Sequence, residues 1–316
     1  MTDTLQVQGE FAPAESSFAA ETLAAAVVAD AAADAVTAEP NGFIELGLAP
    51  ELVQAVADLG YTQPTSVQLK AIPLAMGSGN DSTSFIDLMV SSQTGSGKTA
   101  AFLLPVLHTL IQQQAAAEAE ERAAFERAVA EAAARGEPAP KRAKRKDPTN
   151  SRNFKAATPG ALILCPTREL AQQVAHDAID LVKHCRGLRV ANVVGGMPYQ
   201  LQIAKLQNAN LVVATPGRLL DLQRSMQIKL DKVQFLVVDE ADRMLDLGFS
   251  DDLAELNQLT AQRKQTMMFS ATFAPRIQQL AMRVMHDGGA SVQKVTIDSP
   301  QEKHANIKQM LYWADN

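Results

Sequence analysis

The stretch SSQTGSGKT, residues 91–99, lies between an apolar run, FIDLMVS (85–91), and the amphipathic stretch TAAFLLPVLHTLI. It matches the phosphate-binding pattern G-x-x-x-x-G-K-[ST], except that Ser92 stands at the first glycine position. Glycines let such a loop curl so that its N–H groups face an anion at a helix N-terminus. In this role Lys98 would reach the outer phosphates and Thr99 would bind Mg²⁺. The alternative is a Gly/Ser turn before a helix, which this context disfavours.

Seven short apolar runs alternate with amphipathic stretches along the chain, and this alternation indicates the fold class. Solid apolar runs suit strands buried on both faces of a parallel sheet. We therefore expect an α/β, doubly wound and mostly parallel sheet with helices on both faces, with ligands outside the carboxyl ends of the strands. The expected strands are FIDLMVS (85–91), ALILC (161–165), RVANVV (189–194), NLVVAT (210–215), QFLVVD (234–239), TMMFS (266–270) and VQKVTI (292–297).

Two acidic residues, Asp239 and Glu240, follow the apolar run QFLVVD. Mg²⁺ is typically held by one or two carboxylates together with phosphates and water, which suits Asp239. Glu240 suits the base that orients and activates an attacking water. Alone, two such acids are usually a solvated helix start, but together with the phosphate loop they predict a catalytic nucleotide site.

Composition and charge divide the 316 residues unevenly. Residues 1–40 are rich in alanine and contain seven acids and no Lys or Arg, which predicts a disordered tail. The net charge of the chain is −6, so the remainder carries +1 and can still bind a polyanion through local patches. The N-terminus has no positively charged leader and its apolar stretch is interrupted by acids, so the expected location is cytoplasmic. Two cysteines give no disulfide framework, and no histidine is assigned a ligand role.

An insertion is expected within the domain, at about residues 112–157. Its first half is rich in Ala and Glu and is consistent with a solvated helix, and its second half, which contains KRAKRK (141–146), predicts a disordered basic loop. The basic run favours a solvated linker slightly over an auxiliary electrostatic tether to RNA.

The letters at 239–242 spell DEAD, and with the phosphate loop the chain resembles a DEAD-box RNA helicase, specifically its first RecA-like domain. The resemblance implies ATP and Mg²⁺ as ligands and tolerates a small residue such as Ser92 in the loop. GYTQPTSVQ (60–68) resembles the family's adenine-reading Q motif, so Gln68 would pair with the adenine edge and Phe43 would stack on the base. The implied nucleotide contacts are Phe43, Gln68, Ser92, Gln93, Thr94, Gly95, Ser96, Gly97, Lys98 and Thr99, with Lys98, Asp239 and Glu240 catalytic and Thr99 and Asp239 at the metal.

Further motifs carry the resemblance to RNA binding and to coupling between domains. Three stretches resemble the family's RNA motifs: PTREL (166–170), Gly195-Gly196 and TPGR (215–218). Two of the three directly follow expected strands, and each opens a helix, so they imply contacts to backbone and 2′-OH groups with little sequence preference. Ordinary helix caps are the alternative. Ser270-Ala271-Thr272 resembles the family's SAT motif. This resemblance implies that Ser270 bonds to Asp242 and links nucleotide state to domain orientation. The implied RNA contacts are Pro166, Thr167, Arg168, Gly195, Gly196, Thr215 and Arg218, and the coupling residues are Asp242, Ser270 and Thr272.

The resemblance predicts one RecA-like ATP-binding domain over residues 41–299, with the Q motif at about 41–70. Residues 300–316 resemble an inter-domain linker and the start of a truncated second RecA-like domain, so we expect a fragment of a helicase that unwinds RNA. The alternatives are a lone nucleotide- and RNA-binding module without turnover and a DNA-directed RecA-like ATPase, which the Q motif disfavours. The RNA substrate stays open among ribosome assembly, mRNA decay and cold adaptation.

Overall fold

The computed structural model describes residues 41–77, 85–93, 95–141, 155–289 and 291–297. A single seven-stranded sheet in the order β3-β4-β2-β5-β6-β1-β7 forms its centre, and every strand pair is parallel. All seven expected strands are confirmed. They are β1 (Leu88–Ser91), β2 (Ala161–Leu164), β3 (Val190–Val193), β4 (Leu211–Ala214), β5 (Phe235–Val238), β6 (Gln265–Ser270) and β7 (Gln293–Thr296).

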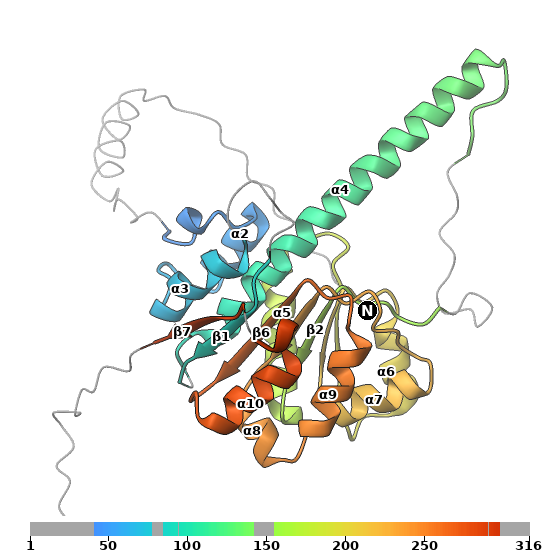
Figure 1. Ribbon diagram of the computed structural model, residues 1–316. Helices are drawn as coiled ribbons and strands as arrows, with labels where there is room; N and C mark the ends of the chain where they lie inside the picture. The colour runs from blue at the N-terminus through green and yellow to red at the C-terminus, as the bar shows by residue number, and fades with distance from the viewer. Residues whose placement is uncertain (1–40, 78–84, 94, 142–154, 290, 298–316) are drawn as a thin grey trace, which may run out of the picture. The chain divides into compact units, whose positions relative to one another are not determined.

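Helices cover both faces of the sheet (Figure 1). One buried cluster joins the sheet to the first four, which are α2 (Pro50–Asp58), α3 (Ser66–Ala75), α4 (Lys98–Ala134) and α5 (Arg168–Leu181). A second cluster on the other face contains residues of α6 (Tyr199–Leu206), α7 (Pro216–Arg224), α8 (Ala241–Asp246), α9 (Ser250–Leu259) and α10 (Pro275–Val284). Two short 3₁₀ turns, η1 (Ile44–Leu46) and η3 (His286–Gly289), complete the described elements.

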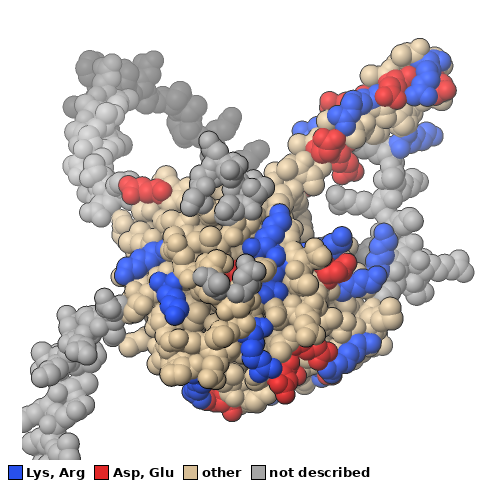
Figure 2. Space-filling model, in the orientation of Figure 1, with Lys and Arg blue, Asp and Glu red and all other residues tan. Residues whose placement is uncertain are grey.

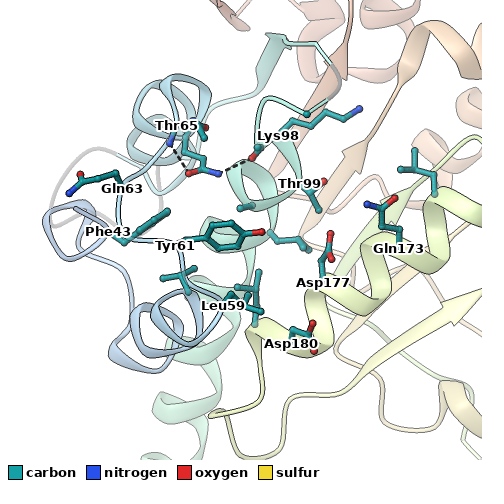
Figure 3. A pocket seen from close by; sticks show the side chains of 18 of the residues that line it. Phe43, Leu59, Tyr61, Gln63, Thr65, Lys98, Thr99, Gln173, Asp177 and Asp180 are labelled. Atoms are coloured by element: carbon teal, nitrogen blue, oxygen red, sulfur yellow. Dashed lines mark hydrogen bonds between the residues drawn. The ribbon is translucent and has the colours of Figure 1, made fainter. Parts of the chain in front are cut away.

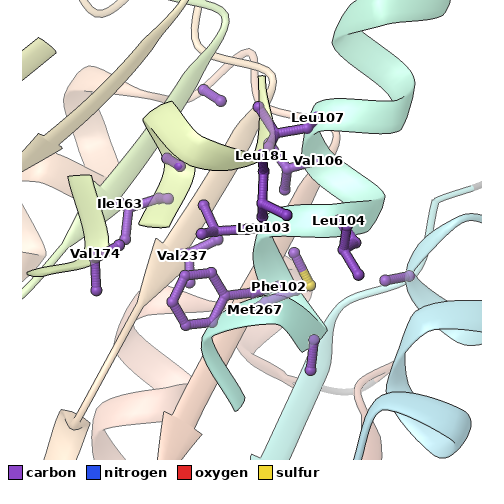
Figure 4. Packing of buried hydrophobic residues seen from close by; sticks show 14 of the residues in the cluster. Phe102, Leu103, Leu104, Val106, Leu107, Ile163, Val174, Leu181, Val237 and Met267 are labelled. Carbon is purple, nitrogen blue, oxygen red and sulfur yellow. The ribbon is translucent and has the colours of Figure 1, made fainter. Parts of the chain in front are cut away.

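The core that positions the phosphate loop is built from the first turns of α4. Phe102, Leu103 and Leu107 are fully or almost fully buried and pack between the sheet and α5 (Figure 4). The ring of Phe102 meets that of Phe269 edge-on, with 5.2 Å between centroids. Because α4 begins at Lys98, burial of these side chains fixes the start of the helix against β6.

Strand order decides which motifs become neighbours. The carboxyl ends of parallel strands lie at one edge of the sheet, so each motif that follows a strand faces that edge. The phosphate loop follows β1, the SAT motif follows β6 and the DEAD motif follows β5, and these three strands are adjacent. The expected RNA motifs follow β2, β4 and β3, which form the neighbouring part of the same sheet.

The expected insertion begins inside a helix rather than after one. Helix α4 has 37 residues, about 56 Å at 1.5 Å per residue, and its second half extends away from the sheet (Figure 1). The solvated helix predicted for the first half of the insertion is therefore confirmed. The basic run from residue 142 and the acidic tail at 1–40 lie outside the described residues, as do residues 298–316.

Two smaller points concern membranes and the cysteine thiols. Within the part of the chain that the structure describes, no helix combines the length and apolarity needed to cross a bilayer. Cys165 is completely buried, as expected, and burial raises the pKa of its thiol well above the usual value.

Candidate functional site

The loop between β1 and α4 has the backbone shape that an anion-binding turn needs. Gly95 and Gly97 have φ values of 80° and 84°, in the left-handed region that favours glycine. A Cβ atom on Gly97 would lie 2.6 Å from Gln68 Nε2 and 2.9 Å from Thr65 Oγ1. Glycine is therefore required at residue 97 both for its φ angle and for the close approach of the α3 N-terminus. Gln93 is described and exposed, whereas Thr94 lies outside the described residues.

Ser92 explains how the loop tolerates a residue other than glycine at its first position. Its φ is not positive, so a side chain costs no backbone strain there. Its N–H donates to the carbonyl of Ser270 at 3.1 Å, which continues the pairing of β1 with β6. The hydroxyls of Ser92 and Ser96 are buried and make no hydrogen bond among the described residues. They leave two donors in the wall of the loop.

The predicted catalytic residues meet across the sheet edge. Lys98 Nζ lies 2.9 Å from Asp239 Oδ1 and 3.4 Å from Glu240 Oε1. Burial alone would lower the pKa of Lys98, but the charges and hydrogen bonds of Asp239 and Glu240 together raise it, so the amine stays charged. Burial raises the pKa of Asp239, and the Lys98 ammonium opposes that shift.

Glu240 occupies an unusual backbone conformation at the start of α8. It has φ 50° and ψ 53°, a left-handed conformation that costs a side-chain-bearing residue on the order of 1 kcal/mol. Its N–H donates to Asp239 Oδ1 at 2.9 Å, which holds the turn. The Glu240 carboxylate also lies 3.6 Å from Arg243 Nη1. The strained turn therefore aims two consecutive carboxylates at the same lysine.

The donor set fits a magnesium ion bound through a nucleotide. Asp239 Oδ2 is buried and has no hydrogen-bond partner in the described structure, so one lone-pair-bearing oxygen remains for a ligand or its water. Thr99 lines the adjacent cavity. Over the described residues no group of three or more His, Cys, Asp or Glu side chains could hold a metal by itself. Phosphate oxygens and water must therefore complete a coordination shell at this place, as is usual for Mg²⁺.

A cavity of about 450 Å³ opens beside these residues, between the Q-motif loop, the start of α4 and the face of α5 (Figure 3). Phe43, the expected stacking residue, lines it but is only 2% exposed and packs in the core. Tyr61 lines the same cavity and is 57% exposed. The accessible ring is therefore that of Tyr61, which the sequence reasoning missed although it lies inside GYTQPTSVQ.

A helix end holds Tyr61 in place. Gly60, with φ 81°, donates its N–H to Ala57 O, and the Tyr61 N–H donates to Val56 O at 3.0 Å. This pair of bonds is the Schellman ending of α2. Leu-Gly-Tyr at 59–61 was a readable signal for this ending, since glycine favours the C′ position.

Gln68 links the Q motif to the phosphate loop. Its Oε1 accepts the Thr65 N–H at 3.0 Å, which completes a capping box on α3, and its Nε2 donates to the carbonyl of Gly97 at 3.0 Å. A primary amide has two donor hydrogens and two acceptor lone pairs. One donor and one acceptor of Gln68 thus remain for a ligand.

The expected RNA motifs lie along the neighbouring part of the same edge. Thr167 Oγ1 caps α5 by accepting the Leu170 N–H at 3.3 Å, and Arg168 Nη1 donates to the carbonyl of Gly195 at 3.4 Å. Gly196 has φ 82°, in the left-handed region that favours glycine, and it approaches the end of the Arg168 side chain closely. The first two motifs, with Pro166 in the first, are therefore in direct contact.

The third RNA motif begins α7. Thr215 occupies the N-cap of this helix without a side-chain capping bond, so its hydroxyl stays available. Arg218 lies 3.9 Å from Asp221 Oδ2, too far for a strong pair. All three motifs follow a strand of the sheet, including the Gly195-Gly196 pair after β3.

A family model described as DEAD/DEAH box helicase matches residues 65–280, more than two thirds of the chain. The chain belongs to the DEAD/DEAH box helicase family. The phosphate loop, the acids at 239–242 and all three expected RNA motifs fall inside the match.

Relatives and solved structures agree with this family. The chain is 36% identical over 289 residues to "DEAD-box ATP-dependent RNA helicase 52A" of rice, covering 86% of this chain and 42% of the relative. It is 35% identical over 272 residues to "ATP-dependent RNA helicase DeaD" of Escherichia coli strain K12, covering 86% of this chain and 35% of the relative. The chain thus spans about half the length, or less, of such relatives.

Two solved structures share the fold. A DEAD box protein from Methanococcus jannaschii matches with a TM-score of 0.59 and 30% identity, covering 81% of this chain and 55% of that chain. Dbp5 from S. cerevisiae, solved bound to RNA and ADP BeF3, matches with a TM-score of 0.58 and 28% identity, covering 81% of this chain and 52% of that chain.

One expectation drawn from the family resemblance is not met. The Ser270 hydroxyl is buried and makes no hydrogen bond in the described structure, so the expected bond to Asp242 is absent. Asp242 lies in the first turn of α8, and Thr272 is exposed after β6. The left-handed turn at Glu240 reorients the chain between Asp239 and Asp242, and the structure leaves Ser270 Oγ beside β1 without a partner.

Proposed function

We propose that the chain is the ATP-binding part of a DEAD-box RNA helicase, which binds ATP with Mg²⁺ and the backbone of single-stranded RNA. The observation that supports this proposal most directly is that Lys98, Asp239 and Glu240 meet beside the cavity. Asp239 Oδ2 has no hydrogen-bond partner among the described residues. In a nucleotide-binding site these three groups supply one cation for phosphates, one metal ligand and one base.

The lysine has a defined task in nucleotide binding. In the absence of nucleotide its ammonium is neutralised by Asp239 and Glu240. Binding would transfer Lys98 to the outer phosphates and free both carboxylates. When bound, Mg²⁺ supplies positive charge that offsets the negative charge of the phosphate oxygens. Asp239 and Thr99 would help to hold the ion. Glu240, released from Lys98, would accept a hydrogen bond from the attacking water and orient it.

Adenine recognition would come from the Q-motif side of the cavity. The free donor and acceptor of Gln68 match the N7 acceptor and the N6 amine of adenine, and guanine offers two acceptors at the same edge. The exposed ring of Tyr61, rather than Phe43, would stack on the base. Phe43 would support the loop from the core.

RNA would bind along the edge formed by Thr167, Arg168, the Gly195-Gly196 pair, Thr215 and Arg218. Hydroxyls, helix N-termini and cationic side chains at this edge suit phosphate and 2′-OH groups rather than base edges. The similar protein Dbp5 was solved bound to RNA and ADP BeF3, which supports RNA binding by this chain.

Turnover and strand separation would belong to a longer protein with a second RecA-like domain. Such a domain would supply arginines to the γ-phosphate, a contribution of roughly 10³–10⁵ in rate at comparable sites. Alone, the chain should bind nucleotide, bind RNA weakly and hydrolyse ATP very slowly. The cytoplasmic location inferred from the sequence stays a prediction.

Calorimetric titration of ATP with Mg²⁺ tests the nucleotide site, with Lys98→Ala as the variant expected to abolish binding. Glu240→Gln should bind ATP normally but stop hydrolysis. RNA-stimulated ATPase is then measured with and without a second RecA-like domain supplied in trans. Heat with ATP but no stimulation under either condition would favour a binding module without turnover, and no heat at all would refute the nucleotide site.

A further inference from the structure

The amino edge of the sheet, opposite the edge described above, carries a row of cationic side chains. Five exposed residues precede or approach the starts of strands there: Lys155, Arg189, Lys229, Lys232 and Lys264. None of the five takes part in an ion pair within the described structure. In the short segments that carry them, only Asp231 is acidic.

Backbone hydrogen bonds hold the starts of the strands, and with them Arg189 and Lys264, in a line along this edge. The N–H of Asn210 donates to Arg189 O, that of Gly160 to Asn210 O, that of Gln234 to Gly160 O and that of Lys264 to Gln234 O, all between 2.7 and 2.9 Å. These bonds connect the starts of β3, β4, β2, β5 and β6. With neighbouring strands about 4.8 Å apart, the row spans about 19 Å. That length accommodates several successive phosphates of one RNA strand.

A cavity of about 630 Å³ lies within the row and is lined by polar groups, with Lys155 and Lys229 on its wall beside Thr158, Asn208 and Asn210. A parallel bridge holds the two lysine segments together, because the Lys229 N–H donates to Ala157 O at 2.8 Å. Figure 2 shows blue Lys and Arg side chains on the right of the visible face, together with some red acidic side chains.

We propose that this amino-edge row, Lys155, Arg189, Lys229, Lys232 and Lys264, is a second RNA-binding surface that contacts phosphates outside the family's RNA motifs. Unpaired cations over amide and hydroxyl groups match a phosphate backbone and offer no apolar anchor for a folded protein. The inference rests on the proposed RNA binding and extends it to longer RNA. Strands of four to six residues separate the two edges by roughly 13–20 Å, so an RNA whose whole length lies on the motif edge does not contact the amino edge.

The test uses the full chain with the double variant Lys229→Gln/Lys232→Gln and two single-stranded RNAs, of about 6 and about 30 nucleotides. For the longer RNA, the plot of log affinity against log salt should become shallower in the double variant. Its slope should decrease by about 1.4, which is about 0.7 for each of the two lost phosphate contacts. For the shorter RNA, the slope should not change. Arg122→Gln/Arg127→Gln, two exposed arginines on the second half of α4, is the control with the same charge change and should leave both slopes as in the wild type.

The outcomes separate this inference from the proposed function. An unchanged slope with the longer RNA, or an equal loss in the control variant, would overturn the amino-edge surface. If Arg218→Ala weakens the binding of both RNAs in the same series, RNA binding by the motif edge is supported regardless of the result for the amino-edge variant. A wild-type chain that binds neither RNA would refute both proposals. ATP affinity should be equal in the wild type, the amino-edge double variant, the control variant and Arg218→Ala, which checks that the variants fold.

Discussion

Lys98 Nζ and Asp239 Oδ1 lie 2.9 Å apart, and the Asp239 side chain is completely buried. The pair joins the start of α4 to the end of β5, residues 141 positions apart in the chain. A buried carboxylate that loses its cation costs about 3–5 kcal/mol. The pair is therefore a structural contact between two residues of the proposed nucleotide site.

Lys98→Ala should lower the free energy of unfolding by about 3 kcal/mol as well as abolish ATP binding, because Asp239 stays buried without its partner. Urea denaturation measures the first effect. The double variant Lys98→Ala/Asp239→Asn should recover most of the stability and none of the binding. Equal stability of the single and double variants would contradict the buried-pair account.

Glu240→Gly should be more stable than Glu240→Ala by about 1 kcal/mol, since both remove the carboxylate but only glycine relieves the left-handed backbone. Thermal unfolding of the two variants gives the comparison. If alanine were as stable as glycine, the positive φ would not be a source of strain.

Tyr61→Leu should weaken ATP binding about 5- to 150-fold, because a base–aromatic stack contributes roughly 1–3 kcal/mol. Leucine preserves an apolar residue at the Schellman end of α2, and Tyr61→Phe should bind as the wild type does. Tyr199→Leu, at another partly exposed tyrosine, is the control. A full loss in the Tyr61→Phe variant would show that the hydroxyl matters and not the ring.

Gln68→Ala should reduce the preference for ATP over GTP and also lower stability by about 1 kcal/mol, because it removes the capping box and the bond to Gly97 O. Gln68→Glu keeps the acceptor for the Thr65 N–H but loses the donor to Gly97. This variant should retain the α3 cap while losing nucleotide selectivity. Equal affinities of the wild type for ATP and GTP would count against the adenine role.

The free energy of unfolding should fall at low pH because His108 becomes protonated. Its Nδ1 accepts the Ala49 N–H at 2.9 Å, and burial lowers the pKa of the imidazole below the usual value near 6.5. The folded state thus binds the proton less well than the unfolded chain. The contribution is complete above about pH 6.5 and is lost progressively below it. His108→Gln, which accepts without titrating, should flatten the acid limb of unfolding free energy against pH.

Much of the nucleotide site could be read before the structure, because its residues follow strands. Phosphate loop, Asp239 and Glu240 were placed at one edge from apolar runs and from the rule for parallel sheets, and the structure brings them together. Phe43 and Tyr61 could not be separated in this way, since both are aromatic residues near the Q motif. Only packing decides that one ring is buried in the core and the other is exposed in the cavity.

The sequence by itself determined the parallel α/β fold and the identity of the phosphate-binding and acidic residues, since hydrophobic period and glycine positions are local properties. Tertiary structure alone decided the pairing of Lys98 with Asp239, the unpartnered Ser270 hydroxyl and the cationic row along the amino edge. These features depend on strand order, β3-β4-β2-β5-β6-β1-β7, which brings residues together across large sequence separations that no local pattern encodes.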